Sequence, residues 1–207
     1  MSTKAPRLTT PDFSPAVCAN SPRPPTNSAI AWCRPLTLRK FQVSGRPVSF
    51  RIGHGFDIHP LVPGRRLVLA GVEIASERGL AGHSDADAAL HALTDALLGA
   101  IGAGDIGRHY PDSDARHKDR GSADFVRETM ATVRERGYRV ANADVTILAE
   151  EPRLAPYLDQ MRATVAELLG VAPDAANVKA TRGEGLGAIG RAEGIAAHAV
   201  VLLERTR

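Results

Sequence analysis

From residue 50 onward, hydrophobic and polar positions repeat in the patterns typical of strands and helices. Before residue 50 no such pattern persists. Residues 50–57 alternate, which predicts a strand, and Gly64-Arg65-Arg66 predicts a turn into a second strand at 67–70. A helix is predicted over 84–103, with Ser84 and Asp87 as an S-x-x-D cap at its start. The apolar stripe of this helix consists of Leu90, Leu93, Leu97, Leu98 and Ile101.

The alternation typical of strands and the three-to-four-residue repeat typical of helices both continue to the end of the chain. Helices are predicted at 122–136 and 157–169, and each is followed by a glycine, Gly137 or Gly170, that can end it. Strands are predicted at 139–149, 177–181 and 195–204, and a polar loop occupies 104–119. Strands that alternate with helices of this length predict an α/β (α+β) fold, a single mixed sheet layered with helices.

Residues 1–50 have a different composition and are not expected to pack as part of that fold. They contain eight of the chain's 14 prolines and many Ser, Thr and Arg residues. The segment fits an organellar transit peptide, a disordered extension, or a start codon assigned too far upstream. We therefore expect a domain at 51–207, located in the cytoplasm of a bacterium or in a plastid if 1–50 is a transit segment.

Charge and cysteine content narrow the chemistry of the predicted domain. The first 50 residues hold seven of the 26 basic and one of the 23 acidic residues, which leaves a net charge of −3 in 51–207. This balance gives no support for a nucleic-acid partner. No apolar run approaches the ~18 residues of a membrane span. Both cysteines, Cys18 and Cys33, precede residue 50, so a metal site in 51–207 must use His and carboxylate ligands.

Asp57, His59 and His91 form the sharpest candidate site. Asp57 and His59 are two residues apart in a predicted strand, so their side chains leave the same face. If the predicted helix adds His91, three ligands surround a divalent ion and leave a fourth position open, as in catalytic zinc sites. The alternative is that Asp57 and His59 only satisfy backbone groups. Asp95, one turn after His91, could orient that imidazole or simply face solvent.

Three further motifs are open to a functional and a structural interpretation. Gly82-His83-Ser84 is predicted at a helix N-terminus, where backbone amides favour a phosphate; the structural alternative is ordinary capping by Ser84. The polar residues of 104–119 fit either a surface loop or a site for the hydroxyls of a polyol. Residues 185–190 match G-x-G-x-x-G, but only 17 residues follow, too few for a dinucleotide-binding unit. We expect these glycines to permit a tight turn or close approach to a ligand.

In combination, these motifs resemble the 2-C-methyl-D-erythritol 2,4-cyclodiphosphate synthase family of the non-mevalonate isoprenoid pathway. The resemblance covers essentially all of 51–207, and it is carried by RIGHGFDIH (51–59), AGHSDADAALH (81–91), DIG (105–107), YPDSD (110–114) and NVKAT (177–181). It implies a homotrimer with active sites between subunits. The implied reaction is cyclisation of 4-diphosphocytidyl-2-C-methyl-D-erythritol 2-phosphate, in which the 2-phosphate attacks the β-phosphorus and CMP leaves.

The resemblance also implies roles for individual residues. Asp57, His59 and His91 would hold zinc or another divalent transition metal, His83 would stabilise the transition state, and Glu184 would lie near a Mg²⁺ or Mn²⁺ ion on the diphosphate. The residues implied to contact the methylerythritol phosphate are Asp57, Ile58, His59, His83, Ser84, Asp105, Ile106, Gly107, Tyr110, Pro111, Asp112, Ser113 and Asp114. Those implied to hold the cytidine diphosphate from the adjacent subunit are Ala149, Glu150, Glu151, Pro152, Arg153, Leu154, Ala155, Thr181, Arg182, Gly183 and Glu184. Ala188 and Arg191 correspond to positions at the substrate or the trimer axis.

The chain departs from the family pattern at three positions. Arg182 replaces a threonine that usually stabilises the transition state, and an arginine can grip phosphate while losing the hydroxyl's geometry. Arg153 replaces a common lysine, and Ala188 replaces a usual aromatic residue. Two other functions remain open: a metal-dependent phosphoesterase that uses water as the nucleophile, and a nucleotide or isoprenoid-phosphate binder made inactive by Arg182.

Overall fold

The computed structural model describes residues 49–111, 113–117 and 120–206. The extension predicted at 1–50 therefore lies outside the described residues, apart from its last two positions. The strands are β1 (Phe50–Pro63), β2 (Leu67–Leu69), β3 (Val72–Ile74), β4 (Arg78–Leu80), β5 (Tyr138–Leu148), β6 (Ala176–Thr181) and β7 (Gly194–Arg205). The helices are α1 (Ala88–Ala100), α2 (Ile106–His109), α3 (Ser122–Glu135), α4 (Leu158–Leu169) and α5 (Gly187–Gly190). None of the described helices is long and apolar enough to cross a membrane.

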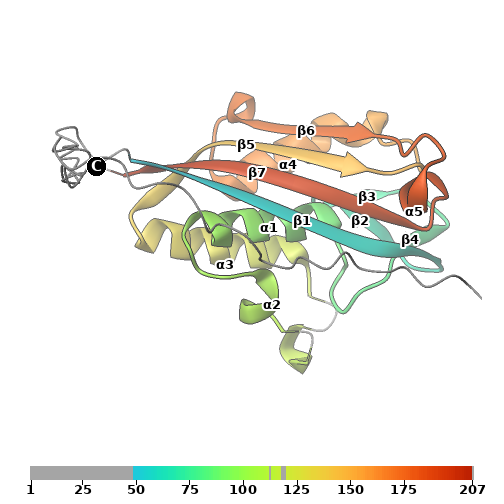
Figure 1. The fold of residues 1–207 in the computed structure, drawn as a ribbon, viewed down its shortest axis with the longest axis horizontal. Helices are drawn as coiled ribbons and strands as arrows, with labels where there is room; N and C mark the ends of the chain where they lie inside the picture. The colour runs from blue at the N-terminus through green and yellow to red at the C-terminus, as the bar shows by residue number, and fades with distance from the viewer. Residues whose placement is uncertain (1–48, 112, 118–119, 207) are drawn as a thin grey trace, which may run out of the picture. The chain divides into compact units, whose positions relative to one another are not determined.

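One mixed sheet carries the fold, as the sequence predicts. Its five strands lie in the order β4-β1-β7-β5-β6, with β7 antiparallel to both β1 and β5 and with β5 and β6 parallel. Strands β2 and β3 form a separate hairpin. Helices α1, α3 and α4 lie behind the sheet in the view of Figure 1.

Two glycines let α1 lie directly against β1. A Cβ atom on Gly55 would come within 2.0 Å of the Ala92 carbonyl oxygen, and one on Gly53 within 1.8 Å of the Ala96 carbonyl oxygen. No side chain larger than hydrogen fits at either position without moving the helix. This close packing places His91 of α1 over the same face of β1 that carries Asp57 and His59.

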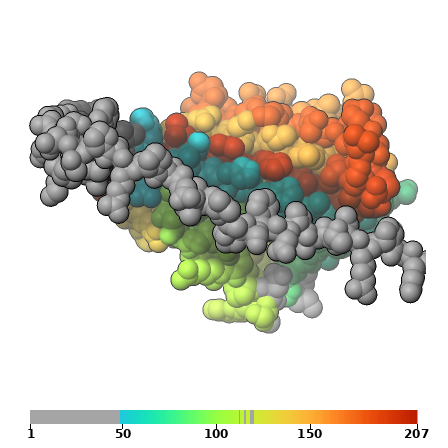
Figure 2. Space-filling model, in the orientation of Figure 1, coloured from blue at the N-terminus to red at the C-terminus, as the bar shows by residue number. Residues whose placement is uncertain are grey.

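The opposite face of the sheet exposes several large apolar side chains within the described part of the chain. Even-numbered residues of β1 point to this face, and Ile52 is 72% exposed while Phe56 and Ile58 are each 47% exposed. Val200 of β7 adds to the same surface. Figure 2 shows this face, on which β1, β7 and β5 form neighbouring diagonal bands of blue, red and yellow.

Several predicted boundaries are wrong, and tertiary contacts explain the largest error. The helix predicted from Ser84 begins at Ala88, because Asp87 is the N-cap and accepts hydrogen bonds from the backbone N–H groups of Ala89 and Leu90. The buried Asp87 carboxylate also accepts from the backbone of Ala70 and Gly71, at 2.9 and 2.7 Å. The strand predicted at 50–57 continues to Pro63, and β3, β4, α2 and α5 were not predicted.

Candidate active site

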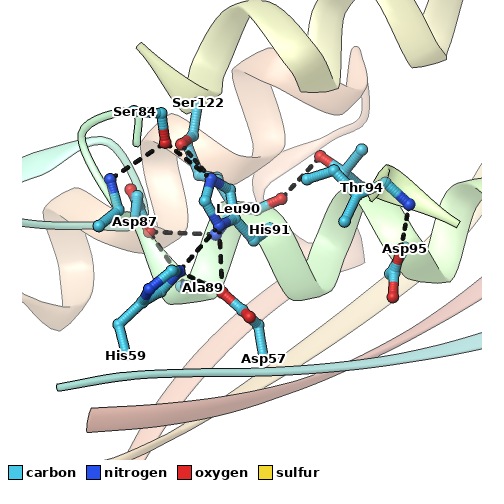
Figure 3. A network of polar contacts seen from close by, with 12 residues as sticks. Asp57, His59, Ser84, Asp87, Ala89, Leu90, His91, Thr94, Asp95 and Ser122 are labelled. Carbon is cyan, nitrogen blue, oxygen red and sulfur yellow. Dashed lines mark hydrogen bonds and ion pairs between the residues drawn. The ribbon is translucent and has the colours of Figure 1, made fainter. Parts of the chain in front are cut away.

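Asp57, His59 and His91 converge on one point, as the strand and helix periods predict. The Asp57 Oδ2 atom lies 2.9 Å from His59 Nε2 and 3.1 Å from His91 Nδ1, and the two nitrogens are 3.1 Å apart. Figure 3 shows Asp57 and His59 reaching from the strand toward His91 on α1. All three side chains are largely buried.

The other nitrogen of each imidazole has its own partner, which orients the ring. His59 Nδ1–H donates to the Ala81 carbonyl oxygen at 3.0 Å, and His91 Nε2–H donates to the Ser122 hydroxyl at 2.8 Å. This leaves His59 Nε2 and His91 Nδ1 as the nitrogens that face Asp57. Hydrogen bonds of this kind fix ring orientation and raise ligand basicity at metal sites.

Ser122 and Asp85 complete the surroundings of His91, and neither residue was predicted to belong to the site. The Ser122 hydroxyl donates to Asp85 Oδ1, while Asp85 Oδ2 accepts from the Ser122 backbone N–H at 3.0 Å. Ser84 Oγ also lies 3.1 Å from His91 Nε2 (Figure 3). Ser122 starts a helix 31 residues after His91, and no local sequence pattern links the two positions.

Asp95 does not orient His91, so that suggestion is wrong. Its carboxylate accepts a hydrogen bond from the Ile106 backbone N–H at 2.7 Å and so anchors the start of α2. The alternative of a purely solvated Asp95 is also wrong.

Electrostatics within the cluster favour a negative Asp57 beside a proton on histidine. Burial alone raises the pKa of Asp57, but hydrogen bonds and charge from His59 and His91 outweigh burial and hold that pKa well below its usual range. Burial alone lowers the pKa of His59, but the hydrogen bond and charge of Asp57 outweigh it, so this pKa is raised. A cation at this position would replace that proton.

The three donor atoms fit a tetrahedral divalent metal. Ligand atoms about 2.0–2.1 Å from a tetrahedral zinc lie roughly 3.3 Å from one another, and the distances here are 2.9–3.1 Å. One carboxylate and two imidazoles are the ligand types of catalytic zinc sites, which keep a fourth position open. Asp57, His59 and His91 can therefore hold the metal.

A cavity of about 380 Å³ opens beside these donors. Besides the three donor residues it is lined by Gly82, His83, Ser84, Ile106, Gly107, Tyr110, His117 and Phe125. His83 Nε2 is buried there and, among the described residues, has no hydrogen-bond partner. His117 and Phe125 were not predicted; they pack around Tyr110, whose ring stacks on Phe125 at 4.4 Å between centroids.

Other residues assigned to this substrate subsite do not line this cavity, and their contact with substrate stays a prediction. Ile58 points to the outer face of the sheet, Asp105 caps α2, and Asp114 pairs with Arg116. Pro111 and Ser113 do not line the cavity, and Asp112 lies outside the described residues. Asp87 accepts from the backbone N–H groups of Ala89 and Leu90 at the start of α1, so a phosphate near Gly82-His83-Ser84, which line the cavity, stays a prediction.

A second cavity of about 560 Å³ gathers most residues assigned to the nucleotide. It is lined by Ala149, Glu150, Pro152, Arg153, Leu154, Ala155, Leu158, Ala180, Thr181 and Arg182. Arg182 forms an ion pair with Glu150, whose other oxygen accepts from the Gly183 backbone N–H at 3.1 Å.

The remaining predicted residues are not part of the second cavity. Glu151 pairs with Arg78, Arg191 pairs with Glu193, and Glu184 and Ala188 do not line it. The glycines of 185–190 permit a tight turn, since a Cβ on Gly190 would lie 2.3 Å from the Gly185 carbonyl carbon.

A mixed sheet covered by helices, with a carboxylate and two imidazoles that could hold a metal ion beside a cavity, places the chain in the class of α+β proteins with a candidate metal-dependent active site. The chain belongs to the YgbB family, whose model matches residues 50–204.

Relatives and solved structures agree with this assignment. The chain is 59% identical over 157 residues to the 2-C-methyl-D-erythritol 2,4-cyclodiphosphate synthase of Geobacillus kaustophilus, an alignment that covers 76% of this chain and 99% of the relative. A structure of a synthase of that name with CDP bound is 40% identical, with a TM-score of 0.70 over 74% of this chain and 100% of that one. The bifunctional IspDF from Campylobacter jejuni is 42% identical, with a TM-score of 0.73 over 75% of this chain; the match spans 42% of that longer chain.

Proposed function

We propose that this chain is a phosphorus–oxygen lyase that cyclises 4-diphosphocytidyl-2-C-methyl-D-erythritol 2-phosphate to 2-C-methyl-D-erythritol 2,4-cyclodiphosphate and releases CMP. The observation that carries the proposal is the Asp57–His59–His91 cluster, which opens into a cavity in a chain 59% identical to a synthase of that name. The reaction serves isoprenoid precursor biosynthesis.

The chemistry requires positioning and charge neutralisation more than a protein nucleophile. An oxygen of the 2-phosphate forms a bond to the β-phosphorus, and the bond from that phosphorus to the CMP oxygen breaks. Zinc at the cluster and a Mg²⁺ or Mn²⁺ ion near Glu184 would offset the repulsion between the two anionic groups. His83 Nε2, buried and unpartnered among the described residues, is placed to donate to a phosphoryl oxygen.

The two cavities would divide the substrate between them. Ile106, Gly107 and Tyr110 offer a partly apolar wall for the methylerythritol carbons beside the cluster. The second cavity, with Arg153 and Arg182 at its wall, suits an anionic cytidine diphosphate.

We propose a homotrimer in which these two half-sites meet across subunits. In one chain the two cavities share no lining residue, yet a single substrate must reach both. The large apolar side chains exposed on the outer face of the sheet, among them Ile52 and Phe56, offer a surface that association can bury.

The experiment is incubation of the full chain with substrate, Zn²⁺ and Mg²⁺, followed by phosphorus NMR. The expected product is the cyclic diphosphate together with CMP. His91→Ala should lower turnover more than about a hundredfold, while His109→Ala should not, because His109 bonds only to the Ala103 carbonyl away from the cluster. A linear phosphate product would identify a phosphoesterase, and CDP binding without turnover would identify an inactive binder.

A further inference from the structure

A second pair of histidines lies on the opposite face of the sheet from the Asp57 cluster. His54 of β1 and His198 of β7 bring Nε2 and Nδ1 to within 3.1 Å of each other. This equals the 3.1 Å between His59 Nε2 and His91 Nδ1 in the cluster. The two pairs face opposite sides because His54 and His59 differ by an odd number of residues along β1.

The strand ladder holds this pair in place without help from a loop. In the antiparallel register of β1 and β7, Phe56 is opposite His198 and Val200 is opposite His54, so the two histidines are diagonal neighbours. The ring of Phe56 also packs on His198 at 4.8 Å between centroids. Two imidazoles on one rigid ladder lose little freedom when they bind a common ligand.

No carboxylate in the described part of the chain forms an ion pair with either histidine. On the neighbouring strand β5, Asp144 lies opposite Val200 and so on the same face of the sheet. Its carboxylate is already bonded to Lys179 and Asn177. The nearby exposed side chains Ile52 and Val200 are apolar. The facing nitrogens therefore either share one hydrogen or bind one cation.

We propose that His54 and His198 form a second transition-metal site, which takes a borderline divalent ion such as Zn²⁺, Ni²⁺ or Cu²⁺. Imidazole suits these ions, and a nitrogen–nitrogen distance of 3.1 Å is close to the roughly 3.3 Å edge of a tetrahedral site. Water or the same residues of a second copy of the chain complete the coordination. The histidine pair itself does not depend on the proposed function; only the contribution of a second copy rests on the proposed homotrimer.

The test compares zinc content after equilibrium dialysis of the full, tag-free chain at several Zn²⁺ concentrations. His54→Ala and His198→Ala should each lower the zinc bound at saturation, by one ion per chain if water completes the site and by one per assembly if copies share it. His109→Ala is the matched control and should change nothing. Cys18 and Cys33 are present in every variant, so any zinc they hold cancels in the comparison.

The Asp57 cluster provides an internal reference. Asp57→Asn should weaken zinc binding at the Asp57 cluster. It should not change zinc binding at the His54–His198 pair, so adding His198→Ala to Asp57→Asn should remove the same amount of zinc as it does in the wild type. A Co²⁺ titration should also lose part of its visible absorption in His198→Ala. Equal zinc content and equal Co²⁺ spectra in the wild type, His54→Ala and His198→Ala would overturn the proposal and leave a plain hydrogen bond between the rings.

Discussion

Arg182 stands where the family resemblance implies a threonine. Its side chain is 64% exposed, and its guanidinium forms an ion pair with Glu150. The guanidinium is therefore not free to bind a phosphate unless that ion pair breaks. The pair holds the pKa of Glu150 below its usual range. To reach the substrate, Arg182 must give up one carboxylate for another anion.

Arg182→Thr should therefore retain or raise turnover, because the pairing with Glu150 limits what the arginine can give to the transition state. The measurement is steady-state turnover by CMP release, with Glu150→Gln and the double variant as controls for the carboxylate left unpaired. A loss of more than about tenfold, ~1.4 kcal/mol, would show that Arg182 has taken over the stabilising role.

Ser122→Ala should weaken zinc binding at the cluster by about tenfold, because His91 loses the closer of its two hydroxyl partners while Ser84 remains. Competition with a chromophoric chelator measures this affinity. Thr132→Ala on the same helix is the control, since its exposed hydroxyl bonds only to the Glu128 carbonyl. An unchanged zinc affinity in Ser122→Ala would contradict the orienting role.

Zinc affinity should fall as the pH is lowered. Asp57 raises the pKa of His59 against the opposing effect of burial, so the metal-free protein keeps a proton that zinc must displace. Below the pKa of His59 we expect roughly a tenfold loss of affinity per pH unit. Chelator competition between pH 5.5 and 8 checks this, and Asp57→Asn should move the onset to lower pH. A flat profile would argue against the coupling.

At the scale of elements, contact between β1 and α1 decides where the cluster forms. Gly55→Ala should push α1 away, since the new methyl would lie 2.0 Å from the Ala92 carbonyl oxygen. We expect about 1–3 kcal/mol less stability in urea unfolding, together with weaker zinc binding. Gly99→Ala is the matched control: its Cβ meets nothing closer than 4.0 Å, and it should be neutral or slightly stabilising.

Helices and strands with a clear repeat of hydrophobic positions could be predicted from the sequence. Boundaries and short strands that depend on contacts between distant segments could not. The stripe of Leu90, Leu93, Leu97, Leu98 and Ile101 is buried as predicted, and alternation placed Asp57 and His59 on the correct face. The start of α1 was missed because Asp87 serves backbone groups of another segment as well as its own helix. Strands β3 and β4 have three residues each, too few to show a period.

The candidate site follows the same division. The convergence of Asp57, His59 and His91 could be predicted because a strand period and a single helix position are enough to bring these candidate metal donors together. Asp85 and Ser122 could not, since 37 residues separate them and only the packing of α3 against α1 makes them neighbours. The ion pair of Arg182 with Glu150, which spans 32 residues, depends likewise on the parallel register of β5 and β6.

At the scale of the whole molecule, the proposed trimer predicts complementation between two inactive variants. His91→Ala damages the metal half-site, and Arg153→Glu puts a negative charge in the second cavity. If each site takes one half from each of two subunits, a random equal mixture should recover about a quarter of wild-type activity. The mixture is made by co-expression and assayed by CMP release. No recovery from assemblies shown to be mixed would place both halves within one chain.

The position of β7 has a consequence for how the protein emerges from the ribosome. This strand is the last in the sequence, yet it lies between β1 and β5 and pairs with both. During translation, β1 must wait for about 140 further residues before its central partner exists, a separation that also slows folding. The nascent sheet therefore cannot close until synthesis of this region is complete, and until then the edge of β1 that β7 later covers has no partner from this strand.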